Sequence, residues 1–143
     1  MRDPISVRPV TQADRAFWSS LDGHLSPGGF DRKVRDRMGY VLFLSGDPAG
    51  ILRFSLFWDE IPFCDLIRIR EDARGKGCGR ALMTHWEKDM AARGYDLALT
   101  STQADEEAQH FYRALGYRDC GAFTLPFPGH EQPTEIILGK HLA

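Results

Sequence analysis

The spacing of hydrophobic residues changes repeatedly along the chain, and each change predicts a strand or a helix. Ile5 to Arg8 alternate as in a short strand, and Thr11 is placed to cap the helix that follows. A loop at 26–29 separates this helix from a short, heavily charged helix predicted over 30–38. The chain therefore opens with one strand and two helices.

Three consecutive strands are predicted in the stretch that follows. The first covers 40–44, a turn at 46–48 leads into the second over 50–58, and the third covers 62–70. The first two have the pattern of a hairpin, because a turn rich in glycine and proline separates two apolar runs.

The hydrophobic period then lengthens from 2 residues to 3.6. Leu82, Trp86 and Met90 recur on one helical face, and Gly94 stands where a C-terminal capping glycine belongs. A further strand is predicted over 95–100. This segment predicts one long helix followed by a return to the sheet.

The last third of the chain predicts one helix and two strands. Thr102 is expected to cap the helix, with Asp105 three residues later completing the capping pattern. The strands are expected over 117–125 and 135–138, separated by a proline-rich loop. The order strand, two helices, three strands, helix, strand, helix, two strands predicts an α/β fold. We expect a three-layer αβα sandwich around a mixed, mostly antiparallel sheet of six or seven strands.

Composition indicates the class of protein. Apolar residues make up 43% of the 143 residues and charged residues 27%, which is typical of a globular chain. A net charge of −2 excludes the global basic field that nucleic-acid binding needs. We expect one domain over 1–143, a cytoplasmic location, no membrane segment and no disulfide framework among the three cysteines. The five histidines have no metal-ligand spacing.

A glycine-rich segment between a predicted strand and a predicted helix is the strongest chemical signal. Residues 74–80 read Arg-Gly-Lys-Gly-Cys-Gly-Arg, and five cations crowd into 68–80. Free backbone N–H groups and partial positive charge at a helix N-terminus favour phosphate oxygens, and glycines let the phosphates approach. The spacing fits neither a P-loop nor a dinucleotide fingerprint. A tight turn carrying solvated charges is the simpler alternative, and the flanking strand, helix and cations disfavour it.

Two motifs resemble those of the GNAT family of N-acetyltransferases. The first is Arg74, Gly77 and Gly79, in the spacing of the family's acyl-CoA motif. The second is Ala108 and Tyr112, followed by Gly116 and Tyr117. With the order of strands and helices, the resemblance covers 5–138. It implies the GNAT acyl-CoA N-acyltransferase fold and an acetyl-CoA-dependent enzyme that needs no metal.

The resemblance also implies where acetyl-CoA binds. The strand before the turn pairs with the pantetheine arm, an amide near Ile67 polarises the thioester carbonyl, and the amides after it hold the pyrophosphate. The residues implied are Ile67, Arg68, Ile69, Arg74, Gly75, Lys76, Gly77, Cys78, Gly79, Arg80 and Asp105. Asp105 stands where the family often has Asn. A thiol at a helix N-terminus is expected to be acidified, yet Cys78 is given no catalytic role.

Tyr112 and Asp65 are the predicted catalytic residues. A positioned phenol can protonate the departing thiolate, although a core tyrosine is the commoner fate of such a residue. Phe63 replaces the glutamate that some members carry, so the base stays open between Asp65, its acidic neighbours Asp59 and Glu60, and a water relay that ends at the backbone or at Thr100 or Ser101.

The expected reaction is acetyl transfer to a primary amine of a small molecule, cationic before deprotonation. Two alternatives stay open: a non-catalytic acyl-CoA-binding regulatory module, and an enzyme acting on a protein lysine or N-terminus. A proline-rich flap at 126–133 favours a small acceptor. No nucleic-acid or membrane partner is expected, and a homodimer is left open.

Overall fold

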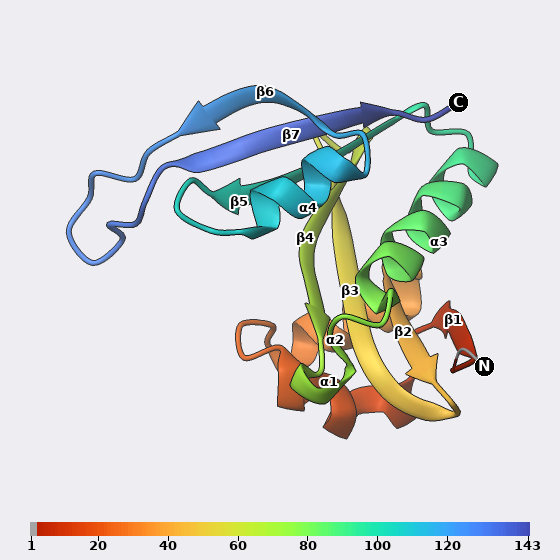
Figure 1. Cartoon of the computed structure of the whole chain (residues 1–143). Coiled ribbons are helices and arrows are strands. Elements are labelled where there is room, and N and C mark those ends of the chain that lie inside the picture. Colours follow the sequence, from red (N-terminus) through yellow and green to blue (C-terminus); the bar gives the residue numbers. More distant parts are fainter. Residues whose placement is uncertain (1–2) are drawn as a thin grey trace. The chain divides into compact units, whose positions relative to one another are not determined.

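The computed structural model describes residues 3–143, and its element order is the one predicted (Figure 1). The strands are β1 (Ile5–Pro9), β2 (Gly39–Leu44), β3 (Asp47–Phe57), β4 (Ile61–Ile69), β5 (Leu97–Gln103), β6 (Arg118–Phe123) and β7 (Glu135–His141). The helices are α1 (Arg15–Leu21), α2 (Pro27–Asp36), α3 (Cys78–Ala92) and α4 (Ala108–Ala114). Short 3₁₀ turns lie at Gln12–Asp14 and Glu71–Ala73.

The strands form one seven-stranded sheet in the order β1-β2-β3-β4-β5-β7-β6. The β1–β2, β2–β3, β5–β7 and β6–β7 pairs are antiparallel, whereas β4 and β5 run parallel. The prediction of a mixed, mostly antiparallel sheet is confirmed. The chain divides into two compact units, the first comprising the chain up to Ser55 with Asp65–Asp89, the second Leu56–Cys64 with Met90–Ala143.

The first unit is layered on both faces of its strands. On one face, Trp18 of α1 and Phe30 of α2 form a buried cluster with Val41 and Ile51 of the sheet. On the other, Trp86 of α3 is fully buried and its ring lies 6.0 Å from that of Phe54. Burial of this kind stabilises by about 1.5–3 kcal/mol per large apolar side chain. Of these helices, α3 is held by the apolar stripe that its hydrophobic period predicted, since Leu82, Trp86 and Met90 are all buried.

The second helix begins earlier than predicted. Ser26 is its N-cap, and the Ser26 hydroxyl accepts a hydrogen bond from the Gly29 amide at 3.0 Å. Pro27 occupies the first helical position, where its missing N–H costs nothing. The prediction of a loop at 26–29 was wrong, because a serine followed by proline is a helix start.

The hairpin turn between β2 and β3 is also displaced from its predicted place. Ser45 and Gly46 both have positive φ, 52° and 85°, as a two-residue hairpin loop requires. β3 then begins at Asp47, and Pro48 pairs with Phe43 beside a register shift in β2. The predicted turn at 46–48 therefore ended two residues too late. Pro48 belongs to the strand, where a bulge accommodates it.

The predicted cap of the last helix was wrong. Thr102 lies inside β5 and is buried, and α4 starts only at Ala108. Asp105 lies in the turn between the two elements and is exposed. A β-branched residue suits a buried strand position, and this preference outweighs the local capping pattern.

Asp14 ties the N-terminal strand to the first 3₁₀ turn. Its carboxylate accepts bonds of 2.7 and 2.9 Å from Arg8 and one of 2.8 Å from the Thr11 amide. The Arg8 hydrogen bonds are the main reason that the pKa of Asp14 lies below its ordinary value. Asp14 therefore contributes stability above the unfolded pKa, and this contribution is lost as the pH falls through the lower folded pKa.

We expect Asp14→Asn to lower the unfolding free energy at pH 7 by about 1–3 kcal/mol, because a buried charged hydrogen-bond network is broken. Denaturant titration measures this, with Asp36→Asn as the control, since within residues 3–143 the ion pair of Asp36 is with its exposed neighbour Arg35. The difference between wild type and Asp14→Asn should shrink as the pH falls below about 4. A difference in unfolding free energy that does not depend on pH would contradict a stabilising role of the charged Asp14 carboxylate.

Candidate active site

The glycine-rich segment forms an open turn ahead of α3. Gly75 and Gly77 have positive φ, 76° and 84°, and a Cβ at either position would meet nothing within 4 Å. Backbone conformation, not lack of space, therefore requires glycine at these two positions. The open space beside them is room for a ligand.

The N-terminus of α3 presents free backbone donors. The first helical bond of α3 runs from the Ala81 amide to the Gly77 carbonyl at 3.0 Å. By helix geometry, the amides of Cys78, Gly79 and Arg80 precede it and have no partner within the helix. Lys76 and Arg80 are exposed beside them. Amides and cations together suit an anionic ligand with several phosphate oxygens.

The five predicted cations do not all remain available. Arg70 is used within the fold, because its Nη1 donates to the Pro48 carbonyl at 2.7 Å and its Nε to Asp72 at 2.5 Å. Arg74 donates from Nε to the Ile69 carbonyl at 3.2 Å. Arg68 is exposed on β4. Arg70 thus holds the turn against β3 and is not available to bind a ligand, in contrast to the exposed Lys76 and Arg80.

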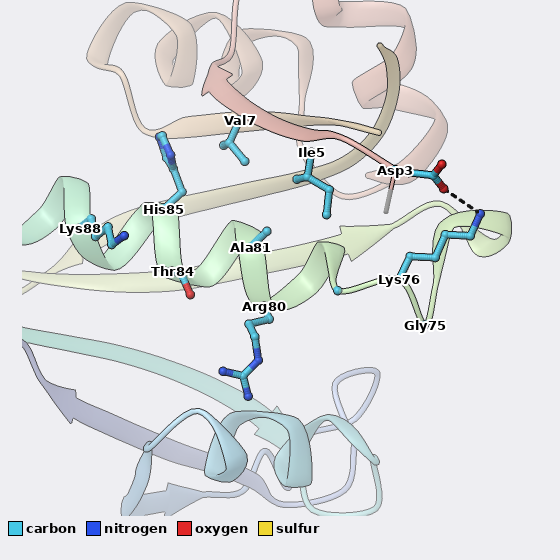
Figure 2. Close-up of a pocket in the computed structure, with 11 residues that line it drawn as sticks. Asp3, Ile5, Val7, Gly75, Lys76, Arg80, Ala81, Thr84, His85 and Lys88 are labelled. Atoms are coloured by element: carbon cyan, nitrogen blue, oxygen red, sulfur yellow. Dashed lines mark ion pairs between the residues drawn. The ribbon is translucent and has the colours of Figure 1, made fainter. Parts of the chain in front are cut away.

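One end of this turn lines a groove of about 940 Å³ in the first unit (Figure 2). The opposite walls of the groove come from β1, through Ile5 and Val7, and from α3, through Ala81, Thr84 and His85. Lys76 reaches to 3.9 Å from Asp3 at the end of the groove. Figure 2 shows the Arg80 side chain extending away from β1. The open space beside Gly75 and Gly77 is therefore continuous with this groove.

Cys78 is the first residue of α3 and is buried, with 2% of its surface exposed. Burial raises the pKa of its thiol, although Lys76 and Arg70 act in the opposite direction. The expectation of an acidified thiol was wrong, because burial outweighs the opposing charges of Lys76 and Arg70. This thiol stays protonated at neutral pH.

β4 carries the predicted pantetheine contacts and Asp65. Its ladder with β5 holds the pairs Phe63–Leu99 and Cys64–Thr100. Ile67, Arg68 and Ile69 follow the end of this ladder on the same strand. Asp65 is exposed, and its charge acts on Lys33 of α2.

Tyr112 lies in the second unit and is buried, with 5% of its surface exposed. Burial raises the pKa of its phenol well above the ordinary value, the nearby Cys64 acts in the same direction, and a hydrogen bond with Thr100 opposes both. The Thr100 hydroxyl donates to the Cys64 carbonyl at 3.1 Å. Because its pKa is raised, the Tyr112 phenol is protonated at neutral pH.

The acidic neighbours of Asp65 in sequence lie in the β3–β4 turn. Asp59 and Glu60 are exposed there, and Trp58 and Asp59 have positive φ, 57° and 59°. Phe57 lies 4.6 Å from the Trp58 ring and 6.2 Å from the Phe63 ring, measured between centroids. Phe57, Trp58 and Phe63 therefore form a small aromatic group in the second unit.

The sequence interpretation missed a polar network centred on Asp22. Asp22 and Arg53 are joined across 31 residues of sequence, a separation at which no local pattern signals a contact. The only signal was a charged residue, Arg53, inside an apolar strand. Among residues 3–143, no three His, Cys, Asp or Glu side chains gather as a metal site would need.

The chain matches the sequence profile of the Acetyltransferase (GNAT) family over residues 8–117. It is 33% identical over 95 residues to streptothricin acetyltransferase of Streptomyces lavendulae, a match that covers 65% of this chain and 50% of that protein. The chain thus spans about half the length of this curated relative.

Solved structures share its fold. Ard1 from Thermoplasma volcanium superposes with a TM-score of 0.81 at 16% identity, over 97% of this chain and 98% of that one. Arabidopsis thaliana Naa50, in complex with the bisubstrate analogue CoA-Ac-MVNAL, gives a TM-score of 0.79 at 14% identity, over 95% and 97%. None of the helices within 3–143 has both the length and the apolarity needed to cross a bilayer.

Proposed function

Because this chain belongs to the GNAT acetyltransferase family, we propose that it transfers an acetyl group from acetyl-CoA to a primary amine of a small molecule. The observation that carries this proposal is the turn at Gly75 and Gly77, which opens free amides toward space beside exposed cations. The pyrophosphate binds the amides of Gly75 to Arg80, with Lys76 and Arg80 supplying charge. Backbone groups of Ile67, Arg68 and Ile69 pair with the pantetheine arm, and Asp105 makes a polar contact with the cofactor.

In this reaction the neutral amine nitrogen attacks the thioester carbonyl carbon. A backbone N–H near Ile67 stabilises the oxyanion that forms, the carbon–sulfur bond breaks, and the sulfur leaves as a thiolate. Tyr112 donates its proton to that thiolate, and the amine gives up its own proton to Asp65, directly or through water. Its raised pKa keeps the Tyr112 phenol protonated until the thiolate forms.

The acceptor is proposed to be a small amine, in keeping with the likeness to streptothricin acetyltransferase. Exposed carboxylates at Asp59, Glu60 and Asp65 attract a cationic amine before it is deprotonated. A protein acceptor is the second candidate, since the Naa50 structure that shares the fold contains a CoA–peptide analogue. A non-catalytic acyl-CoA-binding module is the third.

One assay separates these possibilities. Purified protein is incubated with acetyl-CoA and either an amine panel or a peptide library, and release of the CoA thiol is followed. We expect thiol release with amines above the rate without acceptor. Turnover of peptides alone would favour the protein acceptor. Tight acetyl-CoA binding without acceptor-dependent release would favour the regulatory module.

A further inference from the structure

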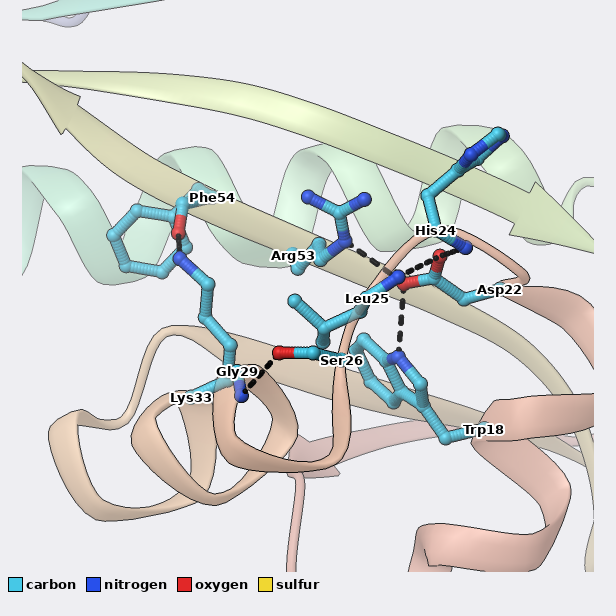
Figure 3. Close-up of polar contacts among 9 residues, drawn as sticks. All are labelled: Trp18, Asp22, His24, Leu25, Ser26, Gly29, Lys33, Arg53 and Phe54. Atoms are coloured by element: carbon cyan, nitrogen blue, oxygen red, sulfur yellow. Dashed lines mark hydrogen bonds and ion pairs between the residues drawn. The ribbon is translucent and has the colours of Figure 1, made fainter.

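Asp22 is a fully buried carboxylate at the end of α1, with 0% of its side chain exposed. It accepts hydrogen bonds from the Trp18 indole at 3.1 Å, the His24 amide at 3.0 Å and the Leu25 amide at 3.3 Å (Figure 3). A fourth bond of 2.8 Å comes from Nε of Arg53 on β3. Burial acts to raise the pKa of Asp22, but these donors, Arg53 first among them, hold it below its ordinary value. The carboxylate is therefore charged and satisfied.

Arg53 is fixed by only one of its three nitrogens. Within residues 3–143, its Nε bonds Asp22, whereas its two terminal nitrogens have no bonded partner. Figure 3 shows these nitrogens pointing away from Asp22. The side chain is 15% exposed, so solvent or a ligand reaches it. A guanidinium whose only role was to neutralise Asp22 would be expected to use its two-nitrogen fork on that carboxylate.

Lys33 adds a second cation to the surroundings of Arg53. Its Nζ donates to the Phe54 carbonyl at 2.5 Å, which fixes the amine on β3. Burial lowers the pKa of Lys33, the charge of Asp65 opposes this, and Arg53 lowers it further. The charges of Arg53 and Asp65 thus both act on Lys33 within the first unit. Arg53 lies on β3 and the proposed base Asp65 on β4, which are neighbouring strands of the sheet.

We infer that Arg53 is a specificity-determining residue that binds a carboxylate, or a similar planar anion, on the acceptor amine. This inference rests on the proposed function, because it takes Asp65 to mark the place of the amine. Arginine holds a carboxylate by two parallel N–H bonds, and Asp22 already fixes the guanidinium, so little freedom is lost on binding. The acceptor is then an amino acid-like molecule, with its amine toward Asp65 and its carboxylate on Arg53.

A ladder of ω-amino carboxylic acids and their matched carboxamides tests this inference. The carboxamide keeps the length and the amine but removes the negative charge. We expect wild-type kcat/KM for the best acid to exceed that of its carboxamide by about 10–100-fold, as for a hydrogen bond between charged groups. Arg53→Lys keeps the charge opposite Asp22 but lacks the fork, so kcat/KM for the acid should fall toward the value for the carboxamide and most of this preference should be lost.

Two further variants exclude a merely structural effect. Arg53→Gln alone would leave the buried Asp22 charge without its cation. The double variant Asp22→Asn, Arg53→Gln removes both charges and therefore avoids this penalty. The double variant should lose the acid preference as Arg53→Lys does. Arg35→Gln is the control, since Arg35 is exposed and, in the part of the chain that the structure describes, its ion pair is with Asp36. An acid-to-carboxamide ratio equal to that of wild type in both Arg53→Lys and the double variant would overturn the inference.

Calorimetry with the amino acids alone separates failure of this inference from failure of the proposed function. If no amine supports turnover, the proposed function fails, and binding decides the role of Arg53. Amino acid binding to wild type that weakens about 10-fold or more in Arg53→Lys then supports a carboxylate site. In that case, absence of amino acid binding to the folded wild type overturns the inference.

Discussion

Gly77→Asp is expected to weaken acetyl-CoA binding by about 100-fold or more, because it places a negative charge next to the pyrophosphate. Gly77 has φ 84° and no atom within 4 Å of the place a Cβ would take, so the new side chain fits but points its carboxylate into the room beside the amides. Repulsion between charges about 4 Å apart is worth several kcal/mol at the effective dielectric of a protein surface. Calorimetry with CoA measures the loss.

Gly77→Asn is the matched control. Asparagine has the size of aspartate and tolerates a left-handed backbone, so it reports the cost of the conformation and of the added atoms alone. We expect Gly77→Asn to weaken binding by much less than Gly77→Asp, and added salt to weaken wild-type binding. Equal affinity in wild type and Gly77→Asp would remove the turn from the cofactor site.

Hydrophobic periodicity was sufficient to predict the order of all strands and helices, because most of them bury one continuous face. Leu82, Trp86 and Met90 are completely buried, as their spacing predicted. The errors lie at the ends of helices and strands, because one or two residues determine where an element begins or stops. Ser26 and Pro27 carried a local signal that was available in the sequence, whereas the strand position of Thr102 depends on burial in the folded chain.

The site divides in the same way between local and distant causes. A turn with glycines at Gly75 and Gly77 follows from local backbone chemistry, and the sequence predicted it. The use of Arg70 within the fold depends on the Pro48 carbonyl, 22 residues away in sequence, and could not be read from the motif. The raised pKa of Cys78 has the same origin, since burial is a property of the whole fold.

Tyr112→Phe should lower turnover by about 10²–10⁴-fold at nearly unchanged acetyl-CoA affinity, if the phenol protonates the departing thiolate. Burial raises the pKa of this phenol, so ionisation of Tyr112 should cause no loss of activity as the pH rises toward 10, the ordinary value for tyrosine. The substitution keeps the ring and its packing and removes one hydroxyl. Steady-state kinetics with a saturating amine measures the effect.

The hydrogen bond between Tyr112 and Thr100 makes a purely structural role the competing explanation. Losing it costs about 1 kcal/mol of stability, which lowers the amount of folded protein but not the turnover of each folded molecule. Tyr117→Phe is the control, since Tyr117 is also buried and its ring lies 5.9 Å from that of Tyr112. We expect Tyr117→Phe to retain turnover per folded molecule. Full turnover per folded molecule in Tyr112→Phe would instead show that the hydroxyl only makes a structural hydrogen bond with Thr100. Solvent would then protonate the thiolate.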